Sequence, residues 1–498
     1  MKYTSTRNNK IHVESSVAIV KGISEDGGLF VPEEIPQVGL DYIQSLCGMN
    51  YKQRAAEILS LWLTDFTKDE LATFTEGAYG GGKFSDDKTC PVVNLGDGKN
   101  ILELWKGPTC AFKDMALQIL PYLLTSASKK TGNDKRIVIL VATSGDTGKA
   151  ALEGFSDVEG TSILVFYPVD GVSPMQKLQM TTQRGENVGV AAIKGNFDDA
   201  QSGVKAIFTD ETIKRKFDEN GCTFSSANSI NWGRLVPQIV YYFSAYCDCV
   251  NDGEIKNGDK INIVVPTGNF GNILAAYFAM KMGLPVNKLI CASNANNVLT
   301  DFIKTGVYDR NRQFFTTCSP SMDILISSNL ERLLFLLSDC DDAVINDWFG
   351  KLKTEGKYTV SADVLAKLQD VFVAGCCDDK DTKDTIAKYF SEKNYLCDTH
   401  TAVAVKVYDD YRKETGDSTP TVIASTASPF KFSKAVLDAV KSGNIDSADE
   451  FGMVDELEDF TGLKAPKQLS SLKGKQPRFT TVCDKDEMVA QVLGMLGL

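Results

Sequence analysis

The alternation of short apolar runs with helical segments after residue 95 constrains the fold of this chain most strongly. Helical segments follow most of these runs, and continuously apolar strands alternating with helices are typical of a mostly parallel, doubly wound sheet. We therefore expect an α/β fold whose ligands bind where strand carboxyl ends meet helix amino ends. The predicted strands are 136–142, 162–167, 188–193, 260–265 and 288–292.

The first 95 residues have a different pattern, with apolar side chains at three- and four-residue spacing. This spacing predicts helices over 40–47, 51–66 and 68–79, and the glycine-rich stretch 78–84 is expected to be a linker. We expect a mainly helical N-terminal region, and the tail from residue 464 is expected to form a strand and a final helix.

The chain length of 498 residues is compatible with two or three domains. We expect a mainly helical domain over 1–95 and a smaller α/β domain over 96–230. A larger α/β domain is expected over 231–498.

Composition excludes several classes of protein. The 53 basic and 65 acidic residues give a net charge of −12, which argues against a nucleic-acid partner. The 13 cysteines include no Cys-x-x-Cys pair, and only two histidines are present, so we expect reduced thiols and no metal site. No apolar run approaches the length of about 18–20 residues that spans a membrane, and the N-terminal residues lack an apolar signal region. We expect a cytoplasmic protein without a membrane partner.

Lys113 is the first candidate for chemistry. It follows Phe112 in Gly-Pro-Thr-Cys-Ala-Phe-Lys-Asp (107–114), directly before a predicted helix. Partial desolvation in such a setting lowers the pKa of an amine and frees it to form an imine. The turn Thr-Ser-Gly-Asp-Thr-Gly (143–148) closes an apolar strand and presents backbone N–H groups to an anion. Together they suggest a covalently held carbonyl cofactor beside an anionic substrate.

A second turn, Pro-Thr-Gly-Asn-Phe-Gly-Asn (266–272), lies between an apolar strand and the predicted helix 273–282. Successive amides and the positive end of a helix dipole form a cradle for a phosphate group. A tight turn without a ligand is the alternative. The turn has neither the phosphate-loop lysine nor the dinucleotide glycine spacing, which disfavours an NAD-dependent oxidoreductase.

With these turns, the chain resembles the threonine synthase family, and in particular its longer branch from fungi and many bacteria. The segments that carry the resemblance lie in the family's order along the chain. They are Gly27–Pro32, 107–118, 142–148, Asn-Ser-Ile-Asn-Trp-Gly-Arg (228–234), 266–272, 322–332, His-Thr-Ala-Val (400–403) and 425–432.

The resemblance implies an enzyme that depends on pyridoxal 5'-phosphate and has the fold type of the tryptophan synthase β subunit. Lys113 would form the Schiff base with the cofactor and act as the catalytic base. Thr426 would face the pyridine nitrogen, where a hydroxyl moderates electron withdrawal into the ring. The cofactor phosphate would be bound by Gly268, Asn269, Phe270, Gly271 and Asn272.

The substrate would bind in two further segments. Ser144 and Thr147 would bind the α-carboxylate of the substrate, whereas Asp146 is expected to order this loop by accepting backbone N–H bonds. Arg234 would bind a phosphate group, although a structural ion pair is an equal alternative. Ser229 and Asn231 from the same motif, and Lys431 as a second positive charge, complete the predicted substrate site.

The implied reaction is that of threonine synthase, a lyase of threonine biosynthesis, which converts O-phospho-L-homoserine and water to L-threonine and phosphate. Ser428 replaces a histidine of the family pattern, Phe430 adds bulk, and Thr399 replaces a proline before His400. These departures leave open a phospho-lyase that releases a 2-oxo acid, ammonia and phosphate. A non-catalytic binding protein is a third reading, against which an intact Lys113 argues. We expect a monomer rather than a dimer.

Overall fold

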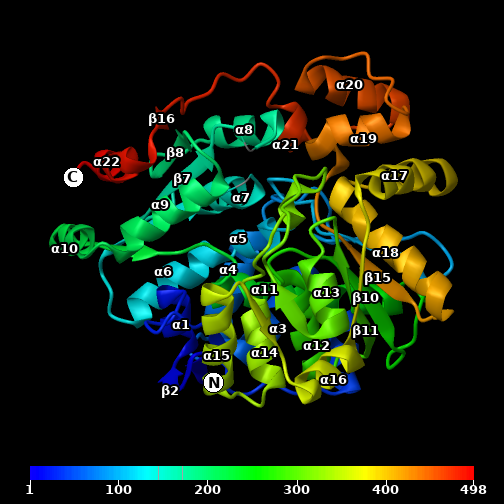
Figure 1. Ribbon diagram of the computed structural model, residues 1–498, viewed down its shortest axis with the longest axis horizontal. Helices are drawn as coiled ribbons and strands as arrows, with labels where there is room; N and C mark the ends of the chain where they lie inside the picture. Colours follow the sequence, from blue (N-terminus) through cyan, green and yellow to red (C-terminus); the bar gives the residue numbers. More distant parts are fainter. Residues whose placement is uncertain (144, 171) are drawn as a thin grey trace.

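The computed structural model describes residues 1–143, 145–170 and 172–498 and contains two large sheets (Figure 1). The six-stranded sheet has the order β14-β11-β10-β15-β5-β4, and all its pairs are parallel except β4–β5. The five-stranded sheet has the order β16-β8-β7-β6-β9 and is parallel throughout. The predicted α/β fold class is confirmed.

The strands of the six-stranded sheet are β14 (Phe372–Cys376), β11 (Val286–Ser293), β10 (Ile261–Pro266), β15 (Thr421–Ser425), β5 (Lys99–Glu103) and β4 (Val92–Asn94). Those of the five-stranded sheet are β16 (Val482–Cys483), β8 (Val188–Ile193), β7 (Thr161–Pro168), β6 (Arg136–Ala142) and β9 (Cys222–Ser225). Every residue of β7, β8 and β10 is buried, which explains why these strands are continuously apolar.

Helices cover both sheets. The five-stranded sheet lies with α7 (Asp146–Phe155), α8 (Pro174–Thr181), α9 (Phe197–Thr209) and α22 (Met488–Leu496) at the upper left of Figure 1. On the larger sheet, α12 (Gly271–Met282) packs on β10 and β11, and α18 (Thr399–Thr415) packs on β10, β11 and β15. The long helix α11 (Trp232–Asn251) packs against α12 and against the N-terminal helices.

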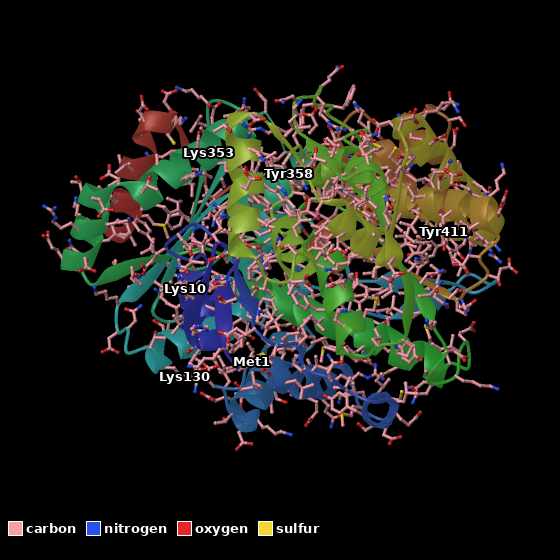
Figure 2. The ribbon with its side chains drawn as sticks, turned by 60° about the horizontal axis from the view of Figure 1, so that its bottom comes forward. Met1, Lys10, Lys130, Lys353, Tyr358 and Tyr411 are labelled. Carbon is pink, nitrogen blue, oxygen red and sulfur yellow. The ribbon has the colours of Figure 1, made fainter. Side chains whose placement is uncertain are left out.

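The N-terminal region contains three helices at the predicted places, α2 (Leu40–Cys47), α3 (Tyr51–Trp62) and α4 (Lys68–Tyr79), although α3 ends at Trp62 and not at residue 66 as predicted. Figure 2 shows Met1 and Lys130 on the same side of the molecule, and Lys130 of α6 (Leu120–Lys130) pairs with Glu70 of α4 at 2.9 Å. Sequence analysis did not predict the sheet β2-β1-β3 in this region, because two of its three strands have only three residues. The three strands are β1 (Tyr3–Ser5), β2 (Asn8–Val13) and β3 (Phe30–Pro32).

Each large sheet contains a strand from a segment that the predicted domain boundaries assign to the other sheet's domain. The segment 96–230 supplies β5 to the larger sheet, and the tail supplies β16 to the smaller sheet before the final helix α22. Both tail elements agree with the expected strand and helix. The division into three domains itself stays a prediction.

The remaining helices are α1 (Ser15–Lys21), α5 (Asp114–Leu117), α10 (Glu211–Glu219), α13 (Val298–Thr305), α14 (Leu330–Leu337), α15 (Asp342–Thr354), α16 (Ala362–Val371), α17 (Asp379–Lys393), α19 (Ser433–Val440), α20 (Glu450–Thr461) and α21 (Lys467–Ser470), with the short strands β12 (Val307–Asp309) and β13 (Lys357–Thr359).

Among the described residues, no helix combines the length and the apolar character needed to cross a bilayer, and no group of three or more His, Cys, Asp or Glu side chains is arranged to hold a metal ion.

Candidate active site

A cavity of about 380 Å³ lies at the carboxyl ends of β6 and β10. This is the position at which doubly wound sheets bind their ligands. The amino ends of α7, α11 and α12 contribute to its wall, so three helix dipoles favour negative charge in it. Of the predicted site residues, the cavity is lined by Lys113, Asp146, Thr147, Ser229, Arg234, Gly268, Asn269, Phe270, Gly271, Asn272 and Thr426.

Lys113 lies directly before α5, and its side chain is only 13% exposed. Burial lowers the pKa of the Lys113 amine to about 8. The carboxylate of Asp146 opposes this shift, whereas the positive charges of Lys431 and Arg234 add to it. The amine therefore holds its proton weakly enough to serve both as a nucleophile and as a base near neutral pH.

The loop from Gly268 to Asn272 has the features of a phosphate cradle. It links β10 to the first turn of α12, with Phe270 in the left-handed region at φ 62°. Within the described part of the chain, the backbone N–H groups of 268–272 donate no hydrogen bond to protein. The Nδ2 atom of Asn272 is buried and also has no partner there. Unused donors at a helix amino end match the phosphate of pyridoxal 5'-phosphate.

The segment 321–329 contacts this loop and holds its backbone in place. The Ser327 hydroxyl donates to the Gly268 carbonyl at 2.7 Å, and the Asn329 backbone N–H donates to the Asn269 carbonyl at 3.1 Å. The Ser321 carbonyl approaches Gly268 so closely that a Cβ atom there would lie 2.7 Å from it. Position 268 therefore requires glycine for the close approach of two backbone segments.

We expect Gly268→Ala to weaken cofactor binding at least tenfold, because the new methyl group pushes the loop away from the 321 carbonyl and disturbs the amide cradle. Titration of the cofactor-free protein with pyridoxal 5'-phosphate, followed by absorbance, measures the change. Gly350→Ala is the matched control, since a Cβ atom at that position meets nothing within 4 Å. An unchanged dissociation constant for Gly268→Ala would contradict the cradle.

The turn before α7 is built around the Thr143 hydroxyl, which accepts hydrogen bonds from the Gly145 and Gly148 backbone N–H groups, each at 3.0 Å. Thr147 lines the cavity at the start of this helix. Ser144, a predicted carboxylate ligand, lies outside the described residues. Among the described residues of this turn, Thr147 therefore remains a candidate ligand for the substrate carboxylate.

Asp146 orders this turn differently from the prediction. Its Oδ1 atom accepts from the side chains of Lys431 at 2.7 Å and Gln176 at 2.9 Å, rather than from backbone N–H groups. Burial by itself raises the pKa of the Asp146 carboxyl, but the charges of Lys431 and Lys113 outweigh burial and hold it below its usual range. Gln176 was missed by the sequence analysis, and its capping box with Ser173 at the start of α8 gives no signal for a contact with Asp146.

Arg234 is buried against the cavity without a carboxylate partner in the described part of the chain. Its exposed fraction is 3%, its Nη1 atom donates to the Ala227 carbonyl, and its Nε atom has no partner. Burial lowers the pKa of this guanidinium to about 10. The predicted alternative of a structural ion pair is therefore not seen, and the unused donor favours an anion in the cavity.

Two predicted substrate residues do not line the cavity. The Asn231 side chain is fully buried and caps α11, accepting from the Gly233 N–H at 2.9 Å and donating to the Ile19 carbonyl at 2.9 Å. Lys431 is also fully buried and is held by Asp146. Both amide hydrogens of Asn231 are used within the protein, and the Lys431 ammonium is enclosed with Asp146 and the Thr109 carbonyl, so this structure places neither side chain where a substrate phosphate was expected.

His400 lies in the cavity wall at the start of α18. Its Nε2 atom accepts the Ser321 backbone N–H at 3.1 Å, and its Nδ1 atom faces Asp398 Oδ1 at 2.9 Å. These contacts fix a neutral ring with its proton on Nδ1. Ser428 is fully buried, with a hydroxyl that has no partner in the described structure, and neither it nor Phe430 lines the cavity.

Three family profiles match the chain. "Threonine synthase N terminus" covers residues 2–79, "Pyridoxal-phosphate dependent enzyme" covers 102–346, and "Threonine synthase, C-terminal" covers 401–493. The three matches follow one another along the chain without overlap.

Curated relatives give the same result. The chain is 37% identical to threonine synthase of Saccharomyces cerevisiae, over 93% of both chains. It is 42% identical to human threonine synthase-like 1 over 86% of its own length, but it spans only 58% of that relative.

Solved structures of threonine synthases share the whole fold. The yeast enzyme superposes with a TM-score of 0.88 at 35% identity, covering 100% of this chain and 99% of the yeast chain. Threonine synthase from Brucella melitensis, in a structure described as bound to the cofactor, gives a TM-score of 0.87 at 36% identity and covers 99% of each chain.

Proposed function

Because the chain belongs to the threonine synthase family of pyridoxal-phosphate-dependent lyases, we propose that it converts O-phospho-L-homoserine and water to L-threonine and phosphate. Family membership confirms the predicted cofactor and enzyme class. The observation that carries the proposal is one cavity that joins Lys113 to two separate sets of anion-binding donors, the 268–272 amides and Arg234. Two such sets suit one phosphate of the cofactor and one of the substrate.

Pyridoxal 5'-phosphate, when bound, withdraws electrons from the substrate so that protons on its carbon chain become acidic. We propose that the amides of Gly268 to Asn272 hold the cofactor phosphate and that Lys113 holds the cofactor covalently. Thr426 lies in the cavity wall at the end of β15, where its hydroxyl is available to the cofactor ring.

Lys113 performs the proton transfers in this proposal. Once the substrate amine has released Lys113 from the cofactor, its Nζ atom takes a proton from the substrate Cα and, after passing that proton on, one from Cβ, so that phosphate leaves from Cγ. The two protons return to the carbon chain, one to Cγ to form the methyl group and one to Cα, while water adds its hydroxyl at Cβ and gives its other proton to the departing phosphate. A pKa of about 8 suits this repeated exchange, because an amine near the operating pH both accepts and releases a proton readily. Arg234 orients the phosphate group, and the start of α7 with Thr147 orients the carboxylate.

Product analysis tests the proposal directly. The holoenzyme incubated with O-phospho-L-homoserine is expected to form threonine and phosphate in equal amounts, measured by amino-acid chromatography and a phosphate assay. Formation of 2-oxobutyrate and ammonia without threonine would instead identify a phospho-lyase. The threonine synthase-like 1 relatives make this second outcome worth measuring, since their names assign no reaction.

A further inference from the structure

A buried contact network extends from the cavity wall at Asp146 to Lys431, which does not line the cavity. Lys431 belongs to the short turn Pro429–Phe432 that follows β15, and its side chain is 0% exposed. Its Nζ atom donates to Asp146 Oδ1 at 2.7 Å and to the Thr109 carbonyl at 3.0 Å. Lys431 thus joins the segment before Lys113 to the first residue of α7.

The two oxygens of Asp146 have separate environments. Oδ1 accepts the ammonium of Lys431 and the Nε2 atom of Gln176, at 2.7 Å and 2.9 Å. Oδ2 lies 3.8 Å from the Nζ atom of Lys113. Two donors on one oxygen fix the carboxylate, so the free oxygen has one position relative to the reacting amine.

We propose that Lys431 is a positioning residue for the amine of Lys113, which fixes Asp146 beside that amine and offsets part of the negative charge that Asp146 presents to it. Lys431 holds Asp146 so that the Oδ2 atom of Asp146 stabilises the protonated amine of Lys113. The positive charge of Lys431 offsets part of this stabilisation. The inference rests on the proposed function only in taking Lys113 as the reacting amine. It replaces the expectation that Lys431 binds a phosphate group.

The charges that face Lys113 come from four elements. Asp146 on α7 is negative, and Asp114 on α5 becomes negative only above about pH 7 because burial raises its pKa to about 7, whereas Arg234 on α11 and Lys431 after β15 are positive. A nearby opposite charge favours the protonated amine, and a like charge disfavours it. Removing the charge of Asp146 therefore lowers the pKa of Lys113, and removing the charge of Lys431 raises it.

The two variants are expected to shift the pKa of Lys113 in opposite directions, which distinguishes this inference from a merely structural role. Asp146→Asn and Lys431→Met break the same buried ion pair, so a loss of packing or of local order would change Lys113 in the same direction in both variants. Only a charge effect transmitted between these groups moves the pKa of Lys113 down in one variant and up in the other.

The experiment measures the pH midpoint at which Lys113 reacts. The full chain, freed of cofactor, is treated with formaldehyde and cyanoborohydride across a pH series, and methylation of the peptide containing Lys113 is quantified by mass spectrometry. We expect a midpoint near pH 8 for the unchanged protein. Asp146→Asn is expected to lower it by about one unit and Lys431→Met to raise it by about one unit.

Glu153→Gln is the matched control. It removes a carboxylate from the same helix, where Glu153 pairs with Lys149 at 2.7 Å, and it should leave the midpoint unchanged. Shifts of equal sign in the two test variants, or no shift in either, would overturn the inference. If Lys431→Met does not fold, Asp146→Asn decides alone, because an unchanged or raised midpoint contradicts the inference.

The holoenzyme gives a second readout. The pH midpoint of its visible cofactor absorbance should move in the same two directions in the two variants. Failure of the proposed function would be seen separately, as an unchanged holoenzyme that makes no threonine, whatever the reactivity of Lys113.

Discussion

Lys113→Ala is expected to abolish threonine formation, with a loss in kcat of at least about 10³-fold. The side chain is the only lysine amine in the cavity wall among the described residues, so no neighbour can replace it as proton carrier. The visible absorbance of the covalently held cofactor should disappear together with the activity. The measurements are phosphate and threonine release from O-phospho-L-homoserine and an absorbance spectrum after dialysis against the cofactor.

The stability of this variant is expected to be unchanged or higher. Burial lowers the pKa of the Lys113 amine to about 8, so the folded protein bears a cost for holding this group protonated at neutral pH, and alanine removes that cost. Lys106→Ala is the matched control, because Lys106 lies nearby in the sequence but pairs with Glu103 at 2.8 Å. A Lys113→Ala protein with full activity and an unaltered spectrum would refute the assignment.

The parallel sheets were predictable because their central strands, such as β7, β8 and β10, are buried at every position and are therefore continuously apolar. The strands 136–142 and 188–193 were predicted with the bounds that β6 and β8 have. The short strands β1 and β3 were not predictable, since three residues give no period. Nor does local sequence reveal that β5 pairs with β15, because that pairing joins segments far apart in the chain.

The glycine-containing turns of the site were predictable for a similar reason. Their small residues follow apolar strands directly, and the carboxyl ends of parallel strands meet at one edge. The partners of the buried charged side chains, in contrast, were not predictable from the sequence. Lys431 was expected to face a substrate, but its contact with Asp146 depends on how the turn after β15 packs against α7. Asn231 was misassigned because a helix cap and a ligand use the same amide group.

Arg234→Met is expected to reduce kcat/KM for O-phospho-L-homoserine by about 10²-fold or more, mainly by raising KM. A buried guanidinium that binds a phosphate contributes several kcal/mol, and about 1.4 kcal/mol corresponds to tenfold in affinity. The same variant should be more thermally stable than the unchanged protein when phosphate is absent. An uncompensated buried charge costs free energy, and methionine fills a similar volume without it.

Arg54→Met is the matched control for this pair of effects. Arg54 is also buried, but its Nη1 atom pairs with Asp248 at 2.7 Å and with the Ser244 hydroxyl at 2.8 Å. Removing it leaves a buried carboxylate without its partner, so this variant should lose about 3–5 kcal/mol of stability with little change in KM. Thermal melts and steady-state kinetics therefore have opposite expected outcomes for the two arginines. A destabilised Arg234→Met protein with an unchanged KM would show that Arg234 holds the fold rather than the substrate.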